Sequence, residues 1–261
     1  MPKFFIDPPT APGEDSIGAQ VTIDGEDAYH LTRVLRVKPG EKVTATDGQG
    51  HLYELALTTV TPEAVHGEVI AVTADHSEPE IKITLCQSIL KGEKMDWVLQ
   101  KGTEIGVSAF VPFLSARTVA RPTPPQFGKK QERWQKIVTA AAKQSGPGII
   151  PAVQPILAGE QLSALFASSV TLVAWEGETI RSLRQVLAGR EQPKEVVLII
   201  GPEGGFAPEE VEMFTNQGAL SISLGSRILR AETAGPLAAA LLLYHYDALE
   251  PTSSTFSKNG R

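Results

Sequence analysis

The chain has 261 residues, 42% of them hydrophobic and 21% charged, and its formal net charge at pH 7 is −6. This length and composition allow a buried core in one large domain or two smaller ones. The single cysteine, Cys86, excludes an internal disulfide framework, and the negative charge argues against indiscriminate nucleic-acid binding. No apolar stretch has the length of a membrane span, and Met1–Phe5 lacks the apolar run of a signal peptide. We expect a soluble, cytoplasmic protein with no membrane contact.

Residues 1–74 are predicted to form a small β-barrel that carries one helix. The strand patterns lie at Val43–Thr46, His51–Val60 and Ala64–Val72. The first two flank Asp47-Gly48-Gln49-Gly50, whose glycines suit a hairpin turn. Asp24–Val37 interrupts the strands as a helix, with Leu31, Val34 and Leu35 on one face. The polar segment Thr73–Glu80 lacks periodicity and marks a domain boundary.

Residues 80–250 show strands alternating with helices, which is typical of an α/β domain. Their continuous apolar runs suit a mainly parallel sheet buried on both faces, with strands at Ile81–Leu85, Ala109–Phe113, Val170–Ala174, Val196–Ile200 and Leu220–Leu224. Apolar spacings of three and four predict helices that contain Met95, Val98, Leu99 and Gly102; Trp134, Ile137, Val138 and Ala141; Ile180, Leu183, Val186 and Leu187; and Leu237, Ala238, Leu241 and Leu242. Gly146-Pro147 is expected to end the second of these helices, and Pro208 fits a first helical turn. The polar segment 251–261 is expected to be a frayed tail.

Two glycine-bearing segments directly follow predicted strands, where the ligands of α/β sheets collect. The first, Ile200-Gly201-Pro202-Glu203-Gly204-Gly205-Phe206, would let a ligand lie close to the main chain, but its spacing fits neither a Walker-type phosphate loop nor the dinucleotide fingerprint. A tight strand-to-helix turn is the alternative interpretation. The second, Leu224–Ala234, opens a helix with Thr233 as N-cap and concentrates two arginines and a glutamate. A solvated patch of structural ion pairs is its alternative.

The two segments together resemble the 16S rRNA uracil N3-methyltransferases of the RsmE family, which belong to the SPOUT superfamily. Further motifs of that family agree along the chain: His30-Leu31-Thr32-Arg33-Val34-Leu35-Arg36 with Pro39-Gly40, Lys101-Gly102-Thr103-Glu104-Ile105-Gly106-Val107 within Lys91–Val107, Arg117, Trp134 and Gln144-Ser145. One short loop can match by chance, whereas this ordered set is specific.

The resemblance implies a PUA-like or OB-like barrel for RNA at 1–74 and a SPOUT domain with a trefoil knot at 80–250. Sequence physics alone does not predict a knot. S-adenosylmethionine is implied to lie bent in the knot, held by Gly201, Pro202, Glu203, Gly204, Leu224, Gly225, Arg227, Ile228 and Leu229. The implied substrate is a specific uridine of 16S rRNA in the 30S ribosomal subunit. A homodimer is also implied, with the helix from Thr233 as the candidate interface, although its apolar face would also read as core.

Two positions depart from the family pattern. An arginine usually follows the Gln-Ser pair, whereas this chain reads Gly146-Pro147-Gly148, so an RNA-facing or dimer-facing contact is missing or supplied elsewhere. Ala207 stands where serine or threonine often caps the next helix, so Pro208 alone is expected to set its start.

Methylation at uracil N3 requires removal of the N3 proton or stabilisation of the resulting anion, whose charge spreads onto both ring carbonyls. Arginine suits the second task because it stays protonated and offers a planar fork of donors. We therefore predict Arg230 as the anion-stabilising or base-orienting group and Glu232 as the proton acceptor. Arg227 is predicted to fix the loop or contact RNA phosphate. Alternatively, Glu232 only holds Arg230 or caps the helix.

RNA-binding candidates are basic residues in both halves of the chain, namely Arg33, Arg36, Lys91, Lys101 and Arg117. The first two lie one helical turn apart with Lys38 close behind, opposite the apolar face of their helix, which suits phosphate contacts. A solvated helix face is the alternative for this pair. Lys101 could equally pair with Glu104.

No metal site is predicted, because no cysteine pair accompanies the histidines and their spacing is not that of ligands: His30, His51, His66, His76 and His245. Trp175-Glu176-Gly177 ends a predicted strand and either borders the cofactor pocket or packs at the edge of the core. Two rival functions stay open. One is a SPOUT enzyme acting on another atom, such as a ribose 2′-hydroxyl, and the other is a non-catalytic RNA-binding or ribosome-assembly factor.

Overall fold

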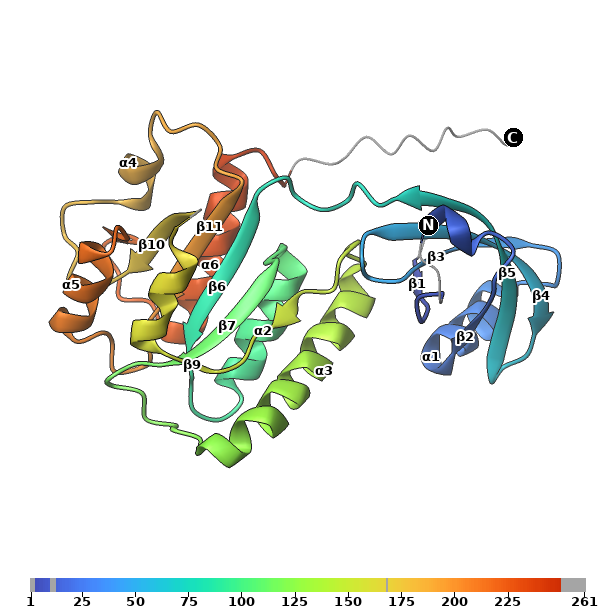
Figure 1. Ribbon diagram of the computed structural model, residues 1–261, viewed down its shortest axis with the longest axis horizontal. Coiled ribbons are helices and arrows are strands. Elements are labelled where there is room, and N and C mark those ends of the chain that lie inside the picture. The colour runs from blue at the N-terminus through green and yellow to red at the C-terminus, as the bar shows by residue number, and fades with distance from the viewer. Residues whose placement is uncertain (1–2, 10–12, 168, 250–261) are drawn as a thin grey trace. The chain divides into compact units, whose positions relative to one another are not determined.

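A computed structural model describes residues 3–9, 13–167 and 169–249, which form two compact units (Figure 1). The N-terminal unit combines Met1–Glu78 with Ala142–Ile150, and the C-terminal unit combines Pro79–Ala141 with Pro151–Arg261. The sequence patterns place residues 142–150 in the second domain, whereas this segment packs within the N-terminal unit. The expected tail at 251–261 lies outside the described residues.

The N-terminal unit is built on a five-stranded sheet with the order β1-β3-β4-β5-β2. Its strands are β1 (Phe4–Phe5), β2 (Gln20–Asp24), β3 (Lys42–Thr46), β4 (His51–Val60) and β5 (Ala64–Ala74), and a 3₁₀ turn occupies Gly13–Ser16. Neighbouring strands are antiparallel except β1 and β3. Alternate residues of β4, including Tyr53, Leu55 and Leu57, are buried in the core of this unit. The three strands and the hairpin predicted here are confirmed.

The predicted helix at Asp24–Val37 exists, but its expected apolar face does not. It consists of α1 (Gly25–Tyr29) followed by a π-helical stretch, η2 (His30–Leu35). Bonding from i to i+5 gives more residues per turn than in an α-helix, so the α-helical spacing behind the expected face does not apply here. Leu31 is fully buried, whereas Val34 and Leu35 are 61% and 44% exposed. Arg36 ends this stretch in the left-handed region with φ of 56°, so it does not follow Arg33 by one α-helical turn.

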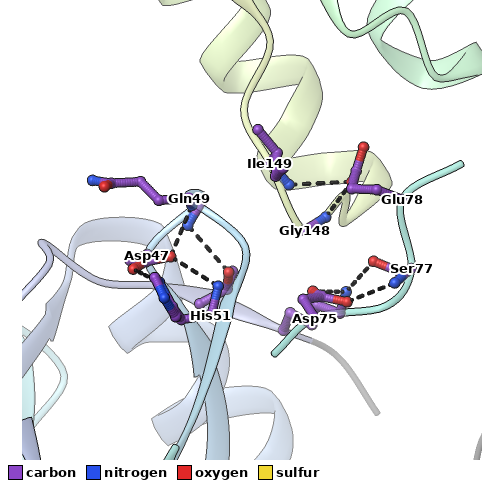
Figure 2. Close-up of polar contacts among 11 residues, drawn as sticks. Asp47, Gln49, His51, Asp75, Ser77, Glu78, Gly148 and Ile149 are labelled. Atoms are coloured by element: carbon purple, nitrogen blue, oxygen red, sulfur yellow. Dashed lines mark hydrogen bonds and ion pairs between the residues drawn. The ribbon is translucent and has the colours of Figure 1, made fainter. Parts of the chain in front are cut away.

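Segment 142–150 runs beside the turn between β3 and β4, and Figure 2 shows the polar contacts at this place. We call residues 47–51, 75–78 and 148–150 the hairpin seam. Gln49 and Ile149 form an antiparallel bridge. The N–H of Gly50 donates to the Gly148 carbonyl at 2.9 Å, and the carboxylate of Glu78 accepts the N–H of Gly148 at 2.6 Å. The main chain of the seam is therefore paired like a short extra strand.

Gly148 has no room for a side chain in this seam. A Cβ atom built on it would lie 2.7 Å from Cγ of Asp75. The carboxylate of Asp75 is itself fixed, because it accepts a hydrogen bond from Nζ of Lys3 at 2.6 Å and one from the N–H of Ser77 at 2.9 Å. Gly146-Pro147-Gly148 therefore meets a packing requirement of the N-terminal unit.

The C-terminal unit contains a seven-stranded parallel sheet with the order β12-β10-β11-β6-β7-β8, and β9 also pairs with β7. The strands are β6 (Lys82–Ser88), β7 (Ala109–Leu114), β8 (Ala152–Val153), β9 (Leu157–Ala158), β10 (Val170–Ala174), β11 (Glu195–Ile200) and β12 (Leu220–Ile222). The five predicted strands correspond to β6, β7, β10, β11 and β12. The expected mixed α/β class with a mainly parallel sheet is confirmed.

Helices cover both faces of this sheet. They are α2 (Lys94–Ile105), α3 (Phe127–Ser145), α4 (Leu183–Leu187), α5 (Pro208–Asn216) and α6 (Ala231–His245), with 3₁₀ turns at Pro124–Gln126 and Gly159–Leu165. Helix α6 packs against α2, β6 and β11. On the opposite face, Cys86 shares a buried cluster with Leu162, Val211 and Phe214. Cys86 is thus a core residue of a strand, and its burial raises the pKa of the thiol.

Several local expectations for the helices need correction. Ile180 precedes α4 and is 81% exposed, so it is not part of a helical face. Helix α6 begins at Ala231 with Arg230 as its N-cap residue, so Thr233 does not cap it. Pro208 is the first residue of α5, but it does not act alone, because the carboxylate of Glu210 accepts the N–H of Ala207 at 3.0 Å.

The end of α3 agrees with the sequence. This helix stops at Ser145, and Gly146 follows with φ of 73°. Among the described residues, no helix is long and apolar enough to cross a membrane.

Candidate active site

A cavity of about 830 Å³ opens where three parallel strands of the C-terminal unit end. Its walls come from the loops after β10, β11 and β12, at residues 174–179, 200–206 and 223–234, and from Lys94 at the start of α2. These strands are neighbours in the sheet, so their carboxyl ends bring the three loops together. Concave sites for small molecules have volumes of roughly 300–1,000 Å³, so the cavity has room for one.

The loop after β11 depends on its glycines. Gly205 has φ of 68°, and a Cβ atom at this position would collide with the carboxylate of Glu176. A Cβ on Gly201 would lie 3.1 Å from the ring of Phe206. Nε2 of Gln87 donates to the carbonyl of Gly201 at 3.3 Å, which holds the loop against β6. Glycine at these positions therefore lets the loop pack closely against Phe206 and Glu176 at the edge of the cavity.

The loop after β12 is more open. Gly225 has φ of 121°, and its N–H donates to Oγ of Ser223 at 3.3 Å. Ile228 is 87% exposed even though it lines the cavity. An apolar side chain exposed at the rim of a cavity is available for contact with a ligand.

Four charged residues meet at the cavity, and we call Lys94, Glu203, Arg230 and Glu232 the charged cluster. Nζ of Lys94 lies 3.4 Å from Oε1 of Glu203 and 3.7 Å from Oε2 of Glu232. Nη1 of Arg230 lies 3.9 Å from Oε1 of Glu232. Oε2 of Glu232 is buried and accepts no hydrogen bond from the described residues. The cluster therefore contains a carboxylate oxygen with an unused acceptor site.

Glu203 is held firmly within this cluster. Burial would raise the pKa of its carboxyl, but the N–H groups of Lys91 and of Glu203 itself, together with the ammonium of Lys94, lower it overall. The bond from the N–H of Lys91 to Oε1 is 3.0 Å long. Glu203 is therefore an ionised anchor between the β11 loop and the segment before α2.

Glu178 forms part of the third wall and is fully engaged by its own neighbours. Its carboxylate accepts bonds from the hydroxyl of Ser221 and from the N–H groups of Ile180 and Arg181. The hydrogen bond from Ser221 is the largest cause of a pKa lowered to about 2, against the opposing effect of burial, and the charge of Arg181 contributes as well. This carboxylate keeps the β10 loop attached to β12.

The structure brings the predicted cofactor and catalytic residues together. Its cavity is lined by Gly201, Pro202, Glu203, Gly204, Leu224, Gly225, Arg227, Ile228, Leu229, Arg230 and Glu232, and also by Trp175 and Glu176. Their roles remain predictions. Lys94 was missed, because a lysine at the start of a helix carries no local signal beyond its place in the Lys91–Val107 segment.

The predicted RNA-binding residues occupy different settings. Nη1 of Arg117 donates to the carbonyl of Gly204 at 3.2 Å, so this side chain supports the β11 loop. Nζ of Lys101 pairs with Glu104 at 2.9 Å, which is the alternative that the sequence left open. Arg33 and Arg36 are exposed in the N-terminal unit. Their contact with RNA remains a prediction.

Known proteins share both units of this chain. Residues 77–243 match the RNA methyltransferase domain family, and residues 23–70 match the RNA methyltransferase PUA domain family. Ribosomal RNA small subunit methyltransferase E of Bacillus subtilis (strain 168) is 31% identical over 254 residues, which cover 95% of this chain and 98% of that protein. The enzyme of the same name from Synechocystis sp. is 33% identical over 231 residues, covering 87% and 74%.

A solved structure agrees with these matches. The crystal structure of ribosomal RNA small subunit methyltransferase E from Neisseria gonorrhoeae, bound to S-adenosyl methionine, superposes with a TM-score of 0.77 at 31% identity. The match covers 94% of this chain and 98% of that one. The PUA-like character expected of the N-terminal unit is confirmed by the family match.

Proposed function

The chain belongs to the ribosomal RNA small subunit methyltransferase E (RsmE) family, and from this premise we propose that it methylates N3 of a specific uridine in 16S rRNA. Family membership supports the coarser activity, methylation of small-subunit rRNA with S-adenosylmethionine as methyl donor. The choice of N3 rests on one observation, the Glu232 carboxylate, which has one cation near each oxygen and whose buried Oε2 accepts no hydrogen bond from the described residues.

The cavity fits S-adenosylmethionine in size and in chemistry. The bare main chain at Gly201 and Gly204 and the open loop from Leu224 to Leu229 would hold the adenosine and amino-acid parts. When bound, the cofactor supplies a methyl group on a positively charged sulfur. A cavity that carries carboxylates suits a ligand with positive charge.

Glu232 is proposed to accept the N3 proton of the target uracil. The N–H bond breaks, the proton moves to the carboxylate, and the electron pair stays on the ring. N3 would then form its bond to the methyl carbon as the carbon–sulfur bond breaks and its electron pair goes to sulfur. Such proton transfer by a positioned carboxylate accelerates a reaction by about 10²–10⁴-fold. The unused acceptor site of Oε2 is the property that this step needs.

Arg230 is proposed to stabilise the negative charge that spreads onto the uracil carbonyls. Its side chain is 83% exposed and only 3.9 Å from Glu232, so most of its donors are free to meet a substrate. Arg227 is proposed to fix the β12 loop or contact a phosphate.

The substrate is proposed to be 16S rRNA in the 30S subunit, bound in part by the PUA-like unit. Arg33 and Arg36 are exposed there, and Arg36 lies at the C-cap of the π-helical stretch that contains Arg33. Lys91, Lys101 and Arg117 are proposed to extend this contact on the C-terminal unit. Phosphate contacts of this kind position RNA without selecting a base.

A homodimer and a trefoil knot are also part of the proposal. Leu237, Leu241 and Tyr244 are exposed on α6 at helical spacing, with exposures of 37%, 39% and 72%. An apolar stripe of this kind supports the helix that begins at Ala231 as the dimer interface. Cross-linking of the purified protein tests the dimer directly.

The decisive experiment incubates the protein with purified 30S subunits that lack the modification and with methyl-labelled S-adenosylmethionine. Digestion to nucleosides and mass spectrometry should find the label in 3-methyluridine. Label on a ribose 2′-hydroxyl would overturn the N3 assignment and leave a methyltransferase. Failure of calorimetry to detect cofactor binding would overturn the enzyme and favour a ribosome-assembly factor.

A further inference from the structure

We propose that Lys94 is a positioning residue of the methyl-transfer reaction, which holds the Glu232 carboxylate in place at the wall of the cavity by bridging it to Glu203. This inference rests on the proposed role of Glu232 as proton acceptor. It adds a third element, α2, to a site that the sequence assigns to two glycine loops alone.

The geometry separates two kinds of contact to the ammonium of Lys94. Glu203, at 3.4 Å, is already fixed by the N–H of Lys91, so it serves as an immobile anchor. Glu232, at 3.7 Å, lies beyond hydrogen-bonding distance and is attracted by charge alone. The ammonium is therefore shared between a carboxylate that accepts a hydrogen bond from the main chain and one whose Oε2 accepts none from the described residues.

The surroundings make this charge important. The side chain of Glu232 is only 16% exposed, so water screens its interaction with a nearby cation less than it screens a surface ion pair. Among the described residues, Lys94 and Arg230 are the cations within ion-pair distance of the Glu232 carboxylate, and Lys94 also pairs with Glu203. Arg230 is 83% exposed and is therefore screened by water, whereas Lys94 is 38% exposed. Lys94 is thus the better shielded of the two cations.

The charges balance through the proposed proton transfer. Before it, the ammonium of Lys94 faces two carboxylates and the uracil is neutral. Afterwards, Glu232 is neutral, the uracil ring carries the negative charge, and Lys94 remains paired with Glu203. Because the charge moves only from Glu232 to the base beside it, the same ammonium stabilises both states.

Lys101 on the same helix shows what an ordinary lysine contact looks like here. It pairs with Glu104 at 2.9 Å within one helical turn, and its side chain is 36% exposed. That local pair joins no other element. Lys94 instead connects α2 to the loops after β11 and β12, and this long-range link distinguishes it from a surface lysine.

The test compares Lys94→Met and Lys94→Arg with the wild type, with Lys82→Gln as the control. Lys82 is exposed at the start of β6 and does not line the cavity. Single-turnover transfer to 30S subunits is measured over a range of pH, cofactor affinity is measured by calorimetry, and stability by thermal unfolding. The titration of Glu232 is followed by NMR of isotope-labelled glutamate carboxyl groups, with Glu232→Gln used to assign the signal.

We expect Lys94→Met to slow the single-turnover step by about 100-fold, with cofactor affinity and melting temperature close to those of the wild type. The acid limb of its rate profile and the NMR titration of Glu232 should both move to higher pH, because a carboxylate without a nearby cation ionises less readily. Lys94→Arg should restore both midpoints and most of the rate. Lys82→Gln should match the wild type.

Two results would overturn the role of Lys94. One is an unchanged Glu232 titration in Lys94→Met, and the other is a loss of rate that only follows a loss of cofactor binding or of folding. A wild-type product methylated at another atom would overturn the proposed N3 chemistry instead. The NMR titration would still decide the role of Lys94 in that case, because it requires neither substrate nor turnover.

Discussion

The hairpin seam and the charged cluster both gather carboxylates, but they use them in opposite ways. In the seam, the carboxylates of Asp47 and Asp75 accept hydrogen bonds of 2.6–3.0 Å from several donors. In the cluster, the ion pairs of Glu232 are 3.7 and 3.9 Å long, and one buried oxygen has no hydrogen-bond donor. A carboxylate whose acceptor sites are filled by hydrogen-bond donors holds the chain in place. A carboxylate with an unfilled acceptor site is available for a proton or a ligand.

The pKa values of the seam agree with a structural role. Burial would raise the pKa of Asp47, but hydrogen bonds from the Gln49 N–H, the His51 ring and the Tyr53 hydroxyl lower it overall. For Asp75, burial is likewise outweighed, in that case by hydrogen bonds from Lys3 and Ser77. These carboxylates stay ionised because hydrogen-bond donors fill their acceptor sites. They therefore have no oxygen available to accept a proton from a substrate or to bind a ligand.

The strongest way to break this comparison is Glu232→Gln. Glutamine keeps the shape of the side chain but cannot accept the proton, so we expect methyl transfer to fall by about 10²–10⁴-fold. Cofactor affinity and melting temperature should stay near the wild-type values. Single-turnover kinetics with labelled cofactor provide the measurement.

The matched control for this change is Glu210→Gln. Its carboxylate accepts the N–H groups of Ala116 and Ala207 at 2.8 and 3.0 Å, so it is saturated. This variant should lose stability and keep its rate per folded molecule. Normal turnover by Glu232→Gln would show that an unfilled acceptor site does not identify the reactive carboxylate.

Glu178 sharpens the comparison. It lies in the cavity wall, but its carboxylate accepts hydrogen bonds from several donors, as the carboxylates of the hairpin seam do. Its pKa of about 2 in the folded protein lies below the ordinary value of 4.5. The carboxylate therefore contributes its full stabilisation above pH 4.5 and loses it progressively as the pH falls towards 2. We expect Glu178→Gln to reduce the free energy of unfolding at neutral pH by about 2–3 kcal/mol.

Denaturant unfolding at several pH values measures this effect. The difference between Glu178→Gln and the wild type should shrink below pH 4.5, where the unfolded-state carboxyl becomes protonated. A difference that stayed constant down to pH 2 would contradict the assigned pKa.

The smallest expected effect comes from Gly148→Ala in the seam. The added methyl group would lie 2.7 Å from Cγ of Asp75, which is fixed by Lys3 and Ser77. We expect a loss of about 1–2 kcal/mol in the stability of the N-terminal unit, with no change in cofactor binding to the C-terminal unit. Gly128→Ala is the control, because no atom lies within 4 Å of a Cβ at that exposed position of α3.

Thermal unfolding of both variants gives this comparison. Equal melting temperatures for Gly148→Ala and the wild type would show that the hairpin seam accommodates the added methyl group without a loss of stability. In that case the Gly146-Pro147-Gly148 sequence would need an explanation other than packing.

Local sequence patterns identified much of this molecule because they depend on near neighbours. The apolar run Val196–Ile200 marked a buried parallel strand, and the glycines from Gly201 to Gly205 marked the bare loop that follows it. The motif resemblance supplied the family, which the matches over residues 77–243 and 23–70 confirm.

The same patterns failed where a tertiary contact overrides local spacing. Of the three apolar residues expected on one face of the first helix, only Leu31 is buried, because a π-helical stretch replaces the α-helical spacing and Val34 and Leu35 are exposed. Segment 142–150 pairs with the β3–β4 hairpin, although it is separated from it by a whole stretch of the other unit.

Lys94 shows most clearly which features of the candidate site the sequence could not predict. Its identity and its helix could be read from the sequence, but its contacts with Glu203 and Glu232 join segments that lie far apart in the chain. The sequence by itself determined eight of the strands, the glycine loops and the residues that carry charge. Only the tertiary structure decided which charges meet and which carboxylate keeps an unused oxygen, because those properties depend on distances between residues that no local pattern encodes.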